Sequence, residues 1–419
     1  MSKKLLAITG GFVPFNDTVT LLSYKHLRLI DADIDVVALK GPTDEGLKNV
    51  IEADLNARKF HIEYVCNYDE AVATFEKKNV IQGIFNIFKY KKECVRKSLK
   101  QDYGIVYSSS IPSFTHWAAY QVKKKNPNIK WIASFSDPLY KSPYKFDKET
   151  LNEYSLITKI GFYVYIGIYM NAWYEKIAMK YADKIIYICE EQRDFMISHY
   201  KNKDSLMNKS LIVPLNYIKD WDIYSKLMNQ DLNIINEKKV FSHFGRVYGL
   251  RKIDLFLLAL KELKEEEENF AEKIIFRQYG EFNSRYMKMI DNYGISDLFE
   301  FSNKISYDQV IDMMKQSDVV VLFDTILSRD ELQPYLPSKS LEYILLRKEI
   351  FILTIENSPS NRIFRNLGYK PTLYELDNIK KAIKELIGND KIEYSYDTSM
   401  YENSIATKKL KEYIESKLV

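Results

Sequence analysis

A short stretch that begins at Pro337 combines residue types suited to holding a phosphate-bearing ligand. Proline favours the first turn of a helix, so the N–H groups of Ser338, Lys339 and Ser340 are expected to be unpaired at the positive end of the helix dipole. Such a helix start predicts an anion site suited to a diphosphate. Glu342 lies about one turn further in, where its carboxylate would accept hydrogen bonds from a sugar's vicinal hydroxyls. The alternative is a plain strand–loop–helix connection with a solvated glutamate.

A second group of charged residues follows another predicted strand. Gly245 and Arg246 come directly after it, and Arg251 and Lys252 follow a few residues later, before a helix. Cations that project from one loop can clamp a diphosphate, and an arginine can do so with two parallel hydrogen bonds. Neutralising a leaving diphosphate would stabilise the charge that develops during group transfer. An ordinary solvated loop is the alternative, but the joint occurrence with the Pro337 stretch favours the clamp.

These residues depend on an alternating β/α pattern that occurs twice. Short, β-branched apolar runs predict buried parallel strands, and a polar stretch over 219–237 predicts a linker between the two halves. We therefore expect an α/β protein of two doubly wound, Rossmann-like domains, 1–217 and 238–397, facing a central cleft, with a C-terminal helix in 398–419 packing back on the first. The predicted strands are Lys4–Thr9, Ile34–Leu39, Gly104–Ser109, Trp131–Phe135, Ile185–Cys189 and Leu211–Leu215, then Val240–Phe244, Ile274–Tyr279, Phe299–Phe301, Val319–Phe323 and Ile350–Thr354.

The first half offers fewer residues for chemistry. Gly10 and Gly11 end the first strand, where paired glycines allow the backbone to approach a ligand, or simply form a turn. Asp137 follows a strand at its carboxyl end, the usual place for ligand contacts in open α/β sheets. His116 lies on a predicted helix and is a candidate catalytic residue or a structural one.

An acidic pattern of the type that holds divalent ions, Asp31 and Asp33, is present but precedes a strand. Ligands are expected after the carboxyl ends of strands, so we predict no metal site here.

Composition limits the class of protein. The 419 residues are 46% hydrophobic and 28% charged with a net charge of +4, which indicates a globular protein and does not favour nucleic acid as a partner. Cys66, Cys94 and Cys189 are scattered, and the apolar run near the start is too short for a signal peptide. Both features predict a cytoplasmic protein.

Residues 81–100 could also meet a membrane. Apolar residues, including Phe85 and Phe88, lead into six basic ones: Lys89, Lys91, Lys92, Arg96, Lys97 and Lys100. This order suits an interfacial helix on the anionic inner face of a membrane, and a core helix with a solvated basic face is the alternative. The apolar run 156–173 is too short and mixed for a transmembrane span.

The ordered motifs "FGRVYGLRKID", "YGEF", "FSNKIS", "SDVVVLFD" and "LPSKSLEYILLRKEIFILT" resemble the retaining GT-B glycosyltransferases of family four, also called group 1. "SSSIPSFTHWAAYQVKKK" and "WIASFSDPLYKSPY" are similar to the first half of one subgroup. The resemblance covers most of the chain. It implies a nucleotide-sugar donor bound mainly by the second domain, an acceptor bound by the first, and neither metal nor other cofactor.

The resemblance also implies roles for single residues. Arg246 and Lys252 would hold the diphosphate, and Gly245 and Gly280 belong to the donor-binding motifs. Pro337 belongs to the donor-binding motif, and Ser338 and Lys339 after it would present backbone amides to the diphosphate. Glu342 would bind the ribose, the backbone near Ile305 would meet the base, and Gly11 would approach the donor sugar.

Three positions depart from the family pattern. Pro334 stands where many relatives carry the first of two glutamates, so Glu331 or Asp330 is a candidate replacement. Ser110 stands where relatives carry a histidine, which leaves the role of His116 open. Without a gap, Arg251 aligns with the relatives' lysine, so either Arg251 or Lys252 is the second clamp cation.

The expected function is a glycosyltransferase that moves a sugar from a nucleotide-diphosphate sugar to a hydroxyl of a glycan or lipid-linked acceptor in bacterial surface-polysaccharide synthesis. The alternatives are a nucleotide-sugar 2-epimerase of the same fold and a catalytically silent partner subunit.

Overall fold

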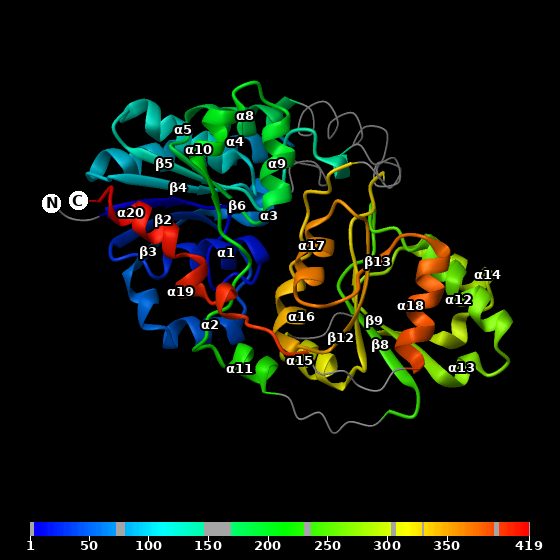
Figure 1. Ribbon diagram of the computed structural model, residues 1–419. Helices are drawn as coiled ribbons and strands as arrows, with labels where there is room; N and C mark the ends of the chain where they lie inside the picture. The colour runs from blue at the N-terminus through cyan, green and yellow to red at the C-terminus, as the bar shows by residue number, and fades with distance from the viewer. Residues whose placement is uncertain are drawn as a thin grey trace. The chain divides into compact units, whose positions relative to one another are not determined.

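The computed structural model describes residues 4–72, 80–145, 169–229, 236–302, 307–328, 331–388 and 394–418. The chain divides into two compact units, drawn in Figure 1. The first consists of Met1–Asn216 together with Tyr401–Val419, and the second is Tyr217–Met400.

The first unit is built on a seven-stranded sheet in the order β3-β2-β1-β4-β5-β6-β7. Every neighbouring pair is parallel, and the residues of β1, β4 and β5 are almost all buried, as expected for a sheet covered on both faces. The strands are β1 (Lys4–Ile8), β2 (Asp33–Lys40), β3 (Phe60–Asn67), β4 (Ile105–Ser109), β5 (Lys130–Ser134), β6 (Lys184–Tyr187) and β7 (Ser210–Ile212).

Helices cover both faces of this sheet (Figure 1). The helices that connect β3 to β4, β4 to β5 and β5 to β6 share one face, because right-handed crossovers in one direction along a sheet fall on one side. Tyr90, Ala118 and Ala178 from these three helices meet in one buried cluster. The helices are α1 (Thr18–Leu27), α2 (Glu45–Ala53), α3 (Tyr68–Val72), α4 (Val80–Lys100), α5 (Phe114–Lys125), α8 (Asn171–Tyr181), α9 (Glu190–Ser198) and α10 (Lys203–Lys209), with short 3-10 turns η1 (Leu55–Lys59) and η2 (Pro143–Lys145).

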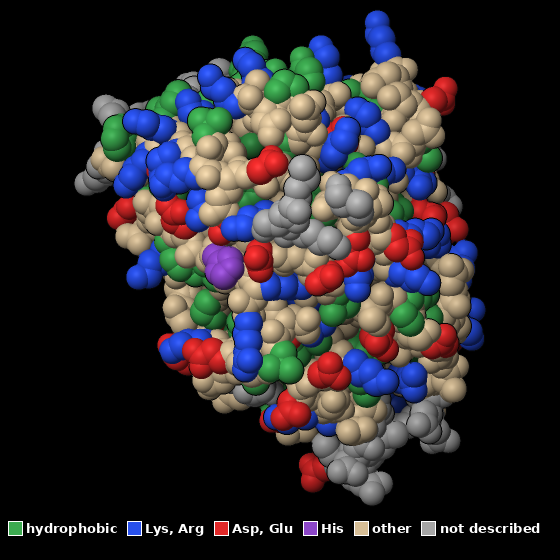
Figure 2. Space-filling model, turned by 90° about the vertical axis from the view of Figure 1, so that its left-hand side faces the viewer, with side chains coloured by type: hydrophobic (Ala, Val, Ile, Leu, Met, Phe, Trp, Pro, Cys, Tyr) green, Lys and Arg blue, Asp and Glu red, His purple; other side chains and the backbone are tan. Residues whose placement is uncertain are grey.

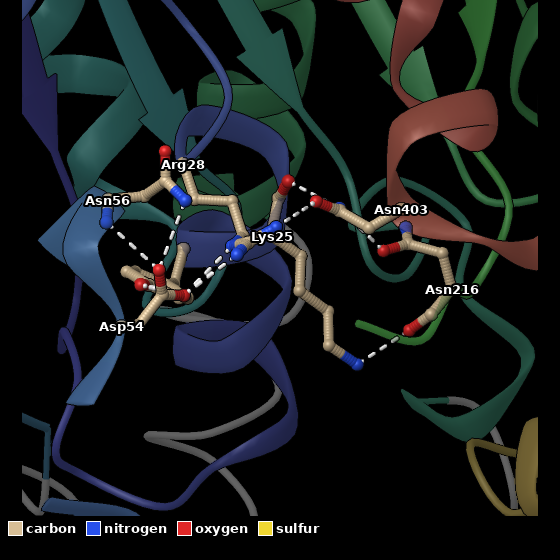
Figure 3. A network of polar contacts seen from close by, with 7 residues as sticks. Lys25, Arg28, Asp54, Asn56, Asn216 and Asn403 are labelled. Carbon is tan, nitrogen blue, oxygen red and sulfur yellow. Dashed lines mark hydrogen bonds and ion pairs between the residues drawn. The ribbon is translucent and has the colours of Figure 1, made fainter. Parts of the chain in front are cut away.

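The C-terminal segment belongs to the first unit and contains α19 (Asn403–Ala406) and α20 (Lys408–Glu415). Figure 3 shows the buried polar network that holds it: the Asn403 side-chain amide donates to the Lys25 carbonyl at 2.8 Å and to Asn216 Oδ1 at 2.9 Å. Arg28 donates to Asn403 Oδ1 at 3.2 Å and pairs with Asp54 at 2.9 Å. The two points at which the chain passes between the units, after Asn216 and before Tyr401, are therefore tied together inside the first unit.

The second unit has a six-stranded parallel sheet in the order β10-β9-β8-β11-β12-β13. Its strands are β8 (Lys239–Phe244), β9 (Ile274–Tyr279), β10 (Phe299–Ser302), β11 (Val319–Phe323), β12 (Glu349–Thr354) and β13 (Thr372–Leu373). Its helices are α11 (Asp222–Met228), α12 (Asp254–Glu266), α13 (Phe270–Lys273), α14 (Ser284–Asn292), α15 (Tyr307–Gln316), α16 (Ser340–Leu346), α17 (Pro359–Asn366) and α18 (Leu376–Gly388), with 3-10 turns η4 (Ser296–Leu298) and η5 (Ser399–Tyr401).

All eleven predicted strands coincide with observed ones, with ends that differ by at most three residues. The expected linker over 219–237 is corrected, because its first part forms α11 and buries Tyr224 and Leu227 against the second unit. Strands β3 and β13 were missed. β3 is a half-exposed edge strand in which polar residues alternate with apolar ones, and β13 is only two residues long.

Candidate active site

Two glycines shape the carboxyl edge of the second sheet. Gly245 follows β8 with φ +148° and Gly280 follows β9 with φ +117°, conformations that side-chain-bearing residues rarely adopt. A Cβ added to Gly280 would lie 2.7 Å from the Gly245 carbonyl oxygen. The two predicted donor-site glycines are thus in contact, and each is needed for the path of the backbone.

A buried pair that was not predicted from the sequence supports this loop. Gln278 in β9 donates to the Gly245 carbonyl at 2.8 Å, and its side-chain oxygen lies 2.9 Å from Nδ1 of His243 in β8. Both side chains are buried, and burial together with the nearby Arg251 lowers the pKa of His243 to about 3. His243 is therefore neutral at physiological pH. A histidine one residue before the end of a predicted strand is the only sequence signal for this pair.

Arg251 turns back across the loop that follows β8. One of its guanidinium nitrogens donates to the Arg246 carbonyl at 2.8 Å, and its carbon lies 5.8 Å from the centre of the Tyr248 ring. The same nitrogen would lie 3.9 Å from a Cβ placed on Gly245. Arg251 Nε is buried and makes no hydrogen bond within the described part of the chain. The guanidinium is therefore held beside Gly245.

Arg246 and Lys252 differ from Arg251 in their surroundings. The Arg246 side chain is 66% exposed and pairs with the equally exposed Glu281 at 3.1 Å, a contact worth little in water. Lys252 is half-buried and has no ion pair among the residues that the structure describes. Both cations are available to an anion, and the structure adds Arg251 as a fixed third cation from the same loop.

The helix predicted to begin at Pro337 begins at Ser340 instead. The Ser340 N–H donates to the Pro337 carbonyl at 3.0 Å, so this amide is already paired and the prediction that it is unpaired is wrong. Ser338 is exposed, and Lys339 lies 3.5 Å from Oε1 of the largely buried Glu342. The predicted anion site therefore has at most the Ser338 and Lys339 amides, because α16 starts with a turn.

The two predicted charged groups lie close together within the second unit. The Ile326 N–H, after β11, donates to the Leu250 carbonyl, after β8, at 2.9 Å. The pKa of Tyr343 is raised mainly by burial, raised further by Glu342 and lowered by Arg251, so both charges act on one ring. The loop after β8 and the start of α16 therefore form one site at the carboxyl edge of the sheet.

Asp324 holds the long loop between β11 and α16. It is fully buried and accepts from the Thr325 N–H at 2.8 Å, from Gln333 at 2.6 Å and from Thr354 at 2.7 Å. Burial raises the pKa of this carboxyl in spite of these bonds. We assign Asp324 a positioning role, because it fixes the segment that leads to Pro337.

The replacement for the missing family glutamate stays open. Glu331 is exposed and accepts from the Ser328 N–H at 3.3 Å, within its own turn. Pro334 is buried. Asp330, and Ile305 with the predicted base contact, lie outside the described residues.

The glycines of the first unit contact the protein itself. A Cβ on Gly10 would lie 1.9 Å from Pro112 Cδ, and one on Gly11 would lie 2.6 Å from Phe15 and 2.8 Å from Thr20. Neither has a positive φ. The close packing of this loop gives both glycines a structural reason, and the approach of Gly11 to a donor sugar stays a prediction.

His116 lies inside the first unit with no exposed surface. Its Nδ1 is 2.8 Å from Ser108 Oγ, which also accepts from the Trp131 indole at 2.8 Å, and its ring packs 4.6 Å from that of Phe135. Burial lowers its pKa to about 3, so the ring is neutral. This placement favours the structural role of the two considered, since no substrate could touch the ring here.

Asp137 lies half-buried beyond the carboxyl end of β5, where the sequence predicted it. Hydroxyl groups surround this end of the sheet: Ser110 Oγ lies 3.1 Å from Ser136 Oγ and accepts from the Ser136 N–H at 3.0 Å. The structure therefore brings one carboxylate and several hydroxyls to the edge where an acceptor is expected.

The acidic pair Asp31 and Asp33 lies at the amino end of β2, with both side chains exposed. Within the described ranges no three His, Cys, Asp or Glu side chains are grouped to hold a metal ion. All three cysteines are free. No helix in the described part of the chain has the length and apolarity needed to cross a bilayer.

Comparison with known proteins identifies a family match within the second unit. The family model described as "Glycosyl transferases group 1" matches residues 225–324, which contain the Gly245 loop, Arg251, Lys252 and Gly280. No curated protein matches the chain in sequence at a significant level.

Solved structures share the whole fold at low identity. A sucrose-phosphate synthase from Thermosynechococcus elongatus has a TM-score of 0.62 and 11% identity over 99% of this chain and 95% of its own. A UDP-forming α,α-trehalose-phosphate synthase from Burkholderia xenovorans has a TM-score of 0.63 and 8% identity over 98% of this chain and 100% of its own. The lipopolysaccharide outer core galactosyltransferase WaaB has a TM-score of 0.58 and 12% identity over 99% of both chains. The two parallel sheets and these likenesses confirm the predicted GT-B fold, and within it residues 225–324 match the group 1 glycosyltransferase model.

Proposed function

We propose that this protein transfers a sugar from a nucleoside-diphosphate sugar to an acceptor hydroxyl with retention of anomeric configuration and without a divalent metal. The observation that carries the proposal is the site of the second unit, where the fixed guanidinium of Arg251 lies beside Gly245, with Arg246, Lys252 and the start of α16 around it. Cations supplied by one rigid loop suit a diphosphate that gains negative charge as it leaves.

The chemical step is an exchange of one carbon–oxygen bond for another. The bond between the anomeric carbon and the diphosphate oxygen breaks, and the acceptor oxygen forms the new bond while its proton is released. The electron pair of the broken bond stays on the diphosphate. Arg246, Arg251 and Lys252 would stabilise this charge, and Glu342 would hold the ribose hydroxyls.

A glycan or lipid-linked saccharide fits the acceptor side best. The corresponding edge of the first unit carries Ser110, Ser136 and Asp137, groups that hydrogen-bond to hydroxyls and add no positive charge. Among proteins of the same fold, WaaB is a lipopolysaccharide galactosyltransferase, whereas the trehalose- and sucrose-phosphate synthases act on small sugars. We favour surface-polysaccharide synthesis in a bacterium and place the reaction in the cytoplasm or on the inner face of its membrane.

A thermal-shift screen against nucleoside diphosphates and nucleotide sugars tests the donor. A ligand at about 100 times its dissociation constant stabilises the folded state by about 2.7 kcal/mol, which gives a clear upward shift. The shift should be lost in Arg251→Ala and kept in Lys288→Ala, which removes an exposed charge on α14. A screen in which no nucleotide shifts the wild type at millimolar concentration would refute the donor assignment.

Product analysis with the nucleotide sugar found by that screen separates the candidate functions. Release of the nucleoside diphosphate, increased by an added glycan or lipid-linked saccharide, supports transfer. Conversion of the donor to its epimer with no released diphosphate would establish the 2-epimerase instead. Binding with neither product would indicate a silent partner subunit.

A further inference from the structure

We propose that the outer face of helices α4, α5 and α8 docks on an anionic lipid bilayer. This α4–α5–α8 face is defined by Phe85, Phe88, Lys91, Lys124, Trp173 and Lys180. The inference rests on the proposed function in one respect, because a lipid-linked acceptor has to be met at a membrane surface.

The face is rich in exposed aromatic side chains. Phe85 is 62% exposed, Phe88 51% and Trp173 43%, and each lies on a different turn or helix. Phe88 packs edge-on against Trp117 at 5.3 Å, and Trp117 lies 6.4 Å from Trp173, so the aromatic groups continue from α4 across α5 to α8. The three helices pack side by side, which makes the aromatic surface continuous.

Lysine ammonium groups lie over these rings. Lys91 is 5.0 Å from the centre of the Phe88 ring and 5.1 Å from that of Trp117. Lys124 lies 5.8 Å from the Tyr120 ring, and Lys180 lies 5.1 Å from the Tyr181 ring. Aromatic rings with a neighbouring cation suit the headgroup region, where the ring enters the boundary of the acyl chains and the charge stays with the phosphates.

No free carboxylate opposes these lysines on the described parts of the three helices. α5 has no acidic residue, and Glu93 of α4 pairs with Arg96. Glu175 of α8 is buried and accepts the Leu139 and Tyr140 N–H groups, each at 2.8 Å. The charge of the face has one sign, which complements anionic lipids and opposes pairing with a second copy of the same face.

The structure also corrects which basic residues of the segment 81–100 are available. Arg96 pairs with Glu63 at 2.9 Å, and Lys97 lies 3.0 Å from Glu63 and 3.6 Å from Asp35. These two cations are held by carboxylates of β2 and β3, so they contribute little to a membrane surface. Lysines of α5 and α8 take their place.

A bilayer is favoured over a nucleic acid. A net charge of +4 over 419 residues is low for a polyanion-binding protein, whereas exposed phenylalanine and tryptophan beside lysine are typical of interfacial surfaces. Figure 2 shows lysine and arginine side chains among hydrophobic ones in its upper part, the side on which α5 and α8 lie in Figure 1.

Vesicle co-sedimentation of the full chain tests the proposal. We expect binding to phosphatidylcholine vesicles containing phosphatidylglycerol at low salt, weaker binding at high salt, and little binding to phosphatidylcholine alone. Replacing Lys91, Lys124 and Lys180 by Gln should weaken binding by roughly a hundredfold, since each lysine contributes about fivefold. Phe85→Ser with Phe88→Ser should also weaken it.

The matched control removes three exposed lysines from the second unit, Lys288→Gln, Lys370→Gln and Lys381→Gln, and should bind like the wild type. The proposal is overturned if the wild type ignores anionic vesicles at low salt, or if the face variants bind as well as the control. It is also overturned if single-stranded RNA binds as tightly as the vesicles and is lost in the same variants.

A second measurement uses the wild type alone. Of the four tryptophans, Trp131 and Trp221 are buried, whereas Trp117 and Trp173 belong to the aromatic surface. Lipids brominated on the acyl chain should quench part of the fluorescence on binding, and absence of quenching in bound protein would overturn insertion of the face. The nucleotide thermal shift should be unchanged in all these variants. If the protein does not bind vesicles but still shows the nucleotide thermal shift, the donor assignment stands and docking is refuted. If the wild type shows no nucleotide thermal shift but binds vesicles, docking stands and the donor assignment is refuted.

Discussion

In each unit a glycine follows the first strand, but the loops that these glycines begin differ in structure. After β1, Gly10 and Gly11 are covered by Pro112, Phe15 and Thr20 from the same unit. After β8, Gly245 adopts a positive φ, and the nearest side chains are those of His243 and Arg251. The glycines that follow the first strand therefore have a packing role in the first unit, whereas Gly245 is part of a charged site in the second.

The difference extends to the charge of the two edges. Near β4 and β5 the first unit presents serine hydroxyls and Asp137, and its buried His116 is surrounded by Ser108 and aromatic rings. The second unit presents Arg246, Arg251, Lys252 and Lys339. The proposed transfer requires binding of a dianionic diphosphate and of a neutral sugar hydroxyl, and the charges of these two edges suit those two ligands.

The largest expected effect is the loss of kcat/KM when a cation of the second unit's site is removed. We expect Arg246→Ala, Arg251→Ala and Lys252→Ala each to lower kcat/KM by roughly a hundredfold, because each removes stabilisation of the leaving diphosphate. Release of nucleoside diphosphate from the donor found by thermal shift is the readout.

Arg251→Lys sharpens the prediction. A lysine cannot bond both the Arg246 carbonyl and a phosphate in the planar geometry of a guanidinium, so we expect it to restore little activity. Lys288→Ala is the control for loss of a remote charge. If Arg251→Ala is damaging and Lys252→Ala is not, Arg251 is the clamp cation of the two. Three folded variants with near-wild-type turnover would show that these cations do not act on the donor.

Substitution by alanine at Gly10 and at Gly245 tests how each glycine contributes to stability. Gly10→Ala places a methyl group 1.9 Å from Pro112 Cδ and 2.3 Å from the Ile111 carbonyl, so overpacking should cost about 1–3 kcal/mol. Gly245→Ala has no atom closer than 3.7 Å and should cost about 1–2 kcal/mol through its backbone conformation alone.

The melting temperatures of Gly10→Ala and Gly245→Ala measure these losses of stability. Gly388→Ala, at the end of α18, is the control, because no atom lies within 4 Å of the added methyl group. We expect Gly10→Ala to melt lower than Gly245→Ala, and both to melt lower than Gly388→Ala. Equal melting of Gly10→Ala and Gly388→Ala would contradict the packed role of the first loop.

The sequence predicted this fold well because buried parallel strands leave continuous apolar runs. Val319–Phe323 is one such run and forms β11 as expected. The half-exposed β3 leaves no such run, and α11 was hidden in a polar stretch although Trp221, Tyr224 and Leu227 recur at helical spacing.

The site was predicted less completely, since a sequence pattern gives residue types and not partners. The motifs located Gly245, Arg246, Arg251 and Lys252, but only coordinates reveal that Arg251 bonds the Arg246 carbonyl. His243, Gln278 and Asp324 were missed as site residues because each acts through buried contacts with segments distant in sequence. The burial of His116 was equally hidden, since its helix carries both buried and exposed positions.

The buried histidines predict a loss of stability in acid. Burial lowers the pKa of His116 and of His243 to about 3, whereas an unfolded histidine titrates near 6.5. The unfolded chain therefore binds protons that the folded chain does not, so stability is complete above pH 6.5 and falls as the pH drops toward 3. Between pH 7 and 5 each histidine should lower the free energy of unfolding by about 2 kcal/mol.

Substitution by Gln separates the two histidines. His116→Gln and His243→Gln should each flatten the dependence of the melting temperature on pH between 7 and 5, and His61→Gln, at an exposed position, should leave it unchanged. If the melting temperature of all three variants falls with pH as steeply as that of the wild type, His116 and His243 take up protons in the folded state and the prediction is wrong. His243→Gln should in addition weaken the nucleotide shift, because His243 supports the Gly245 loop through Gln278, and His116→Gln should not.

The smallest expected effect is that of removing divalent metal. Asp31 and Asp33 lie at the amino end of β2, whereas Gly10 follows the carboxyl end of its neighbour β1, so the acidic pair is at the opposite end of the sheet from the ligand edge. The Asp31 N–H donates to Glu415 of α20 at 3.0 Å, which places this turn against the C-terminal helix. In the second unit, three cations from one loop can neutralise a diphosphate without a metal. We therefore expect EDTA to leave turnover unchanged and Asp33→Ala to behave like the wild type. An absolute requirement for manganese or magnesium that Asp33→Ala abolishes would contradict this, and would mean that the acidic turn, and not the Arg251 loop, supplies the charge on which the reaction depends.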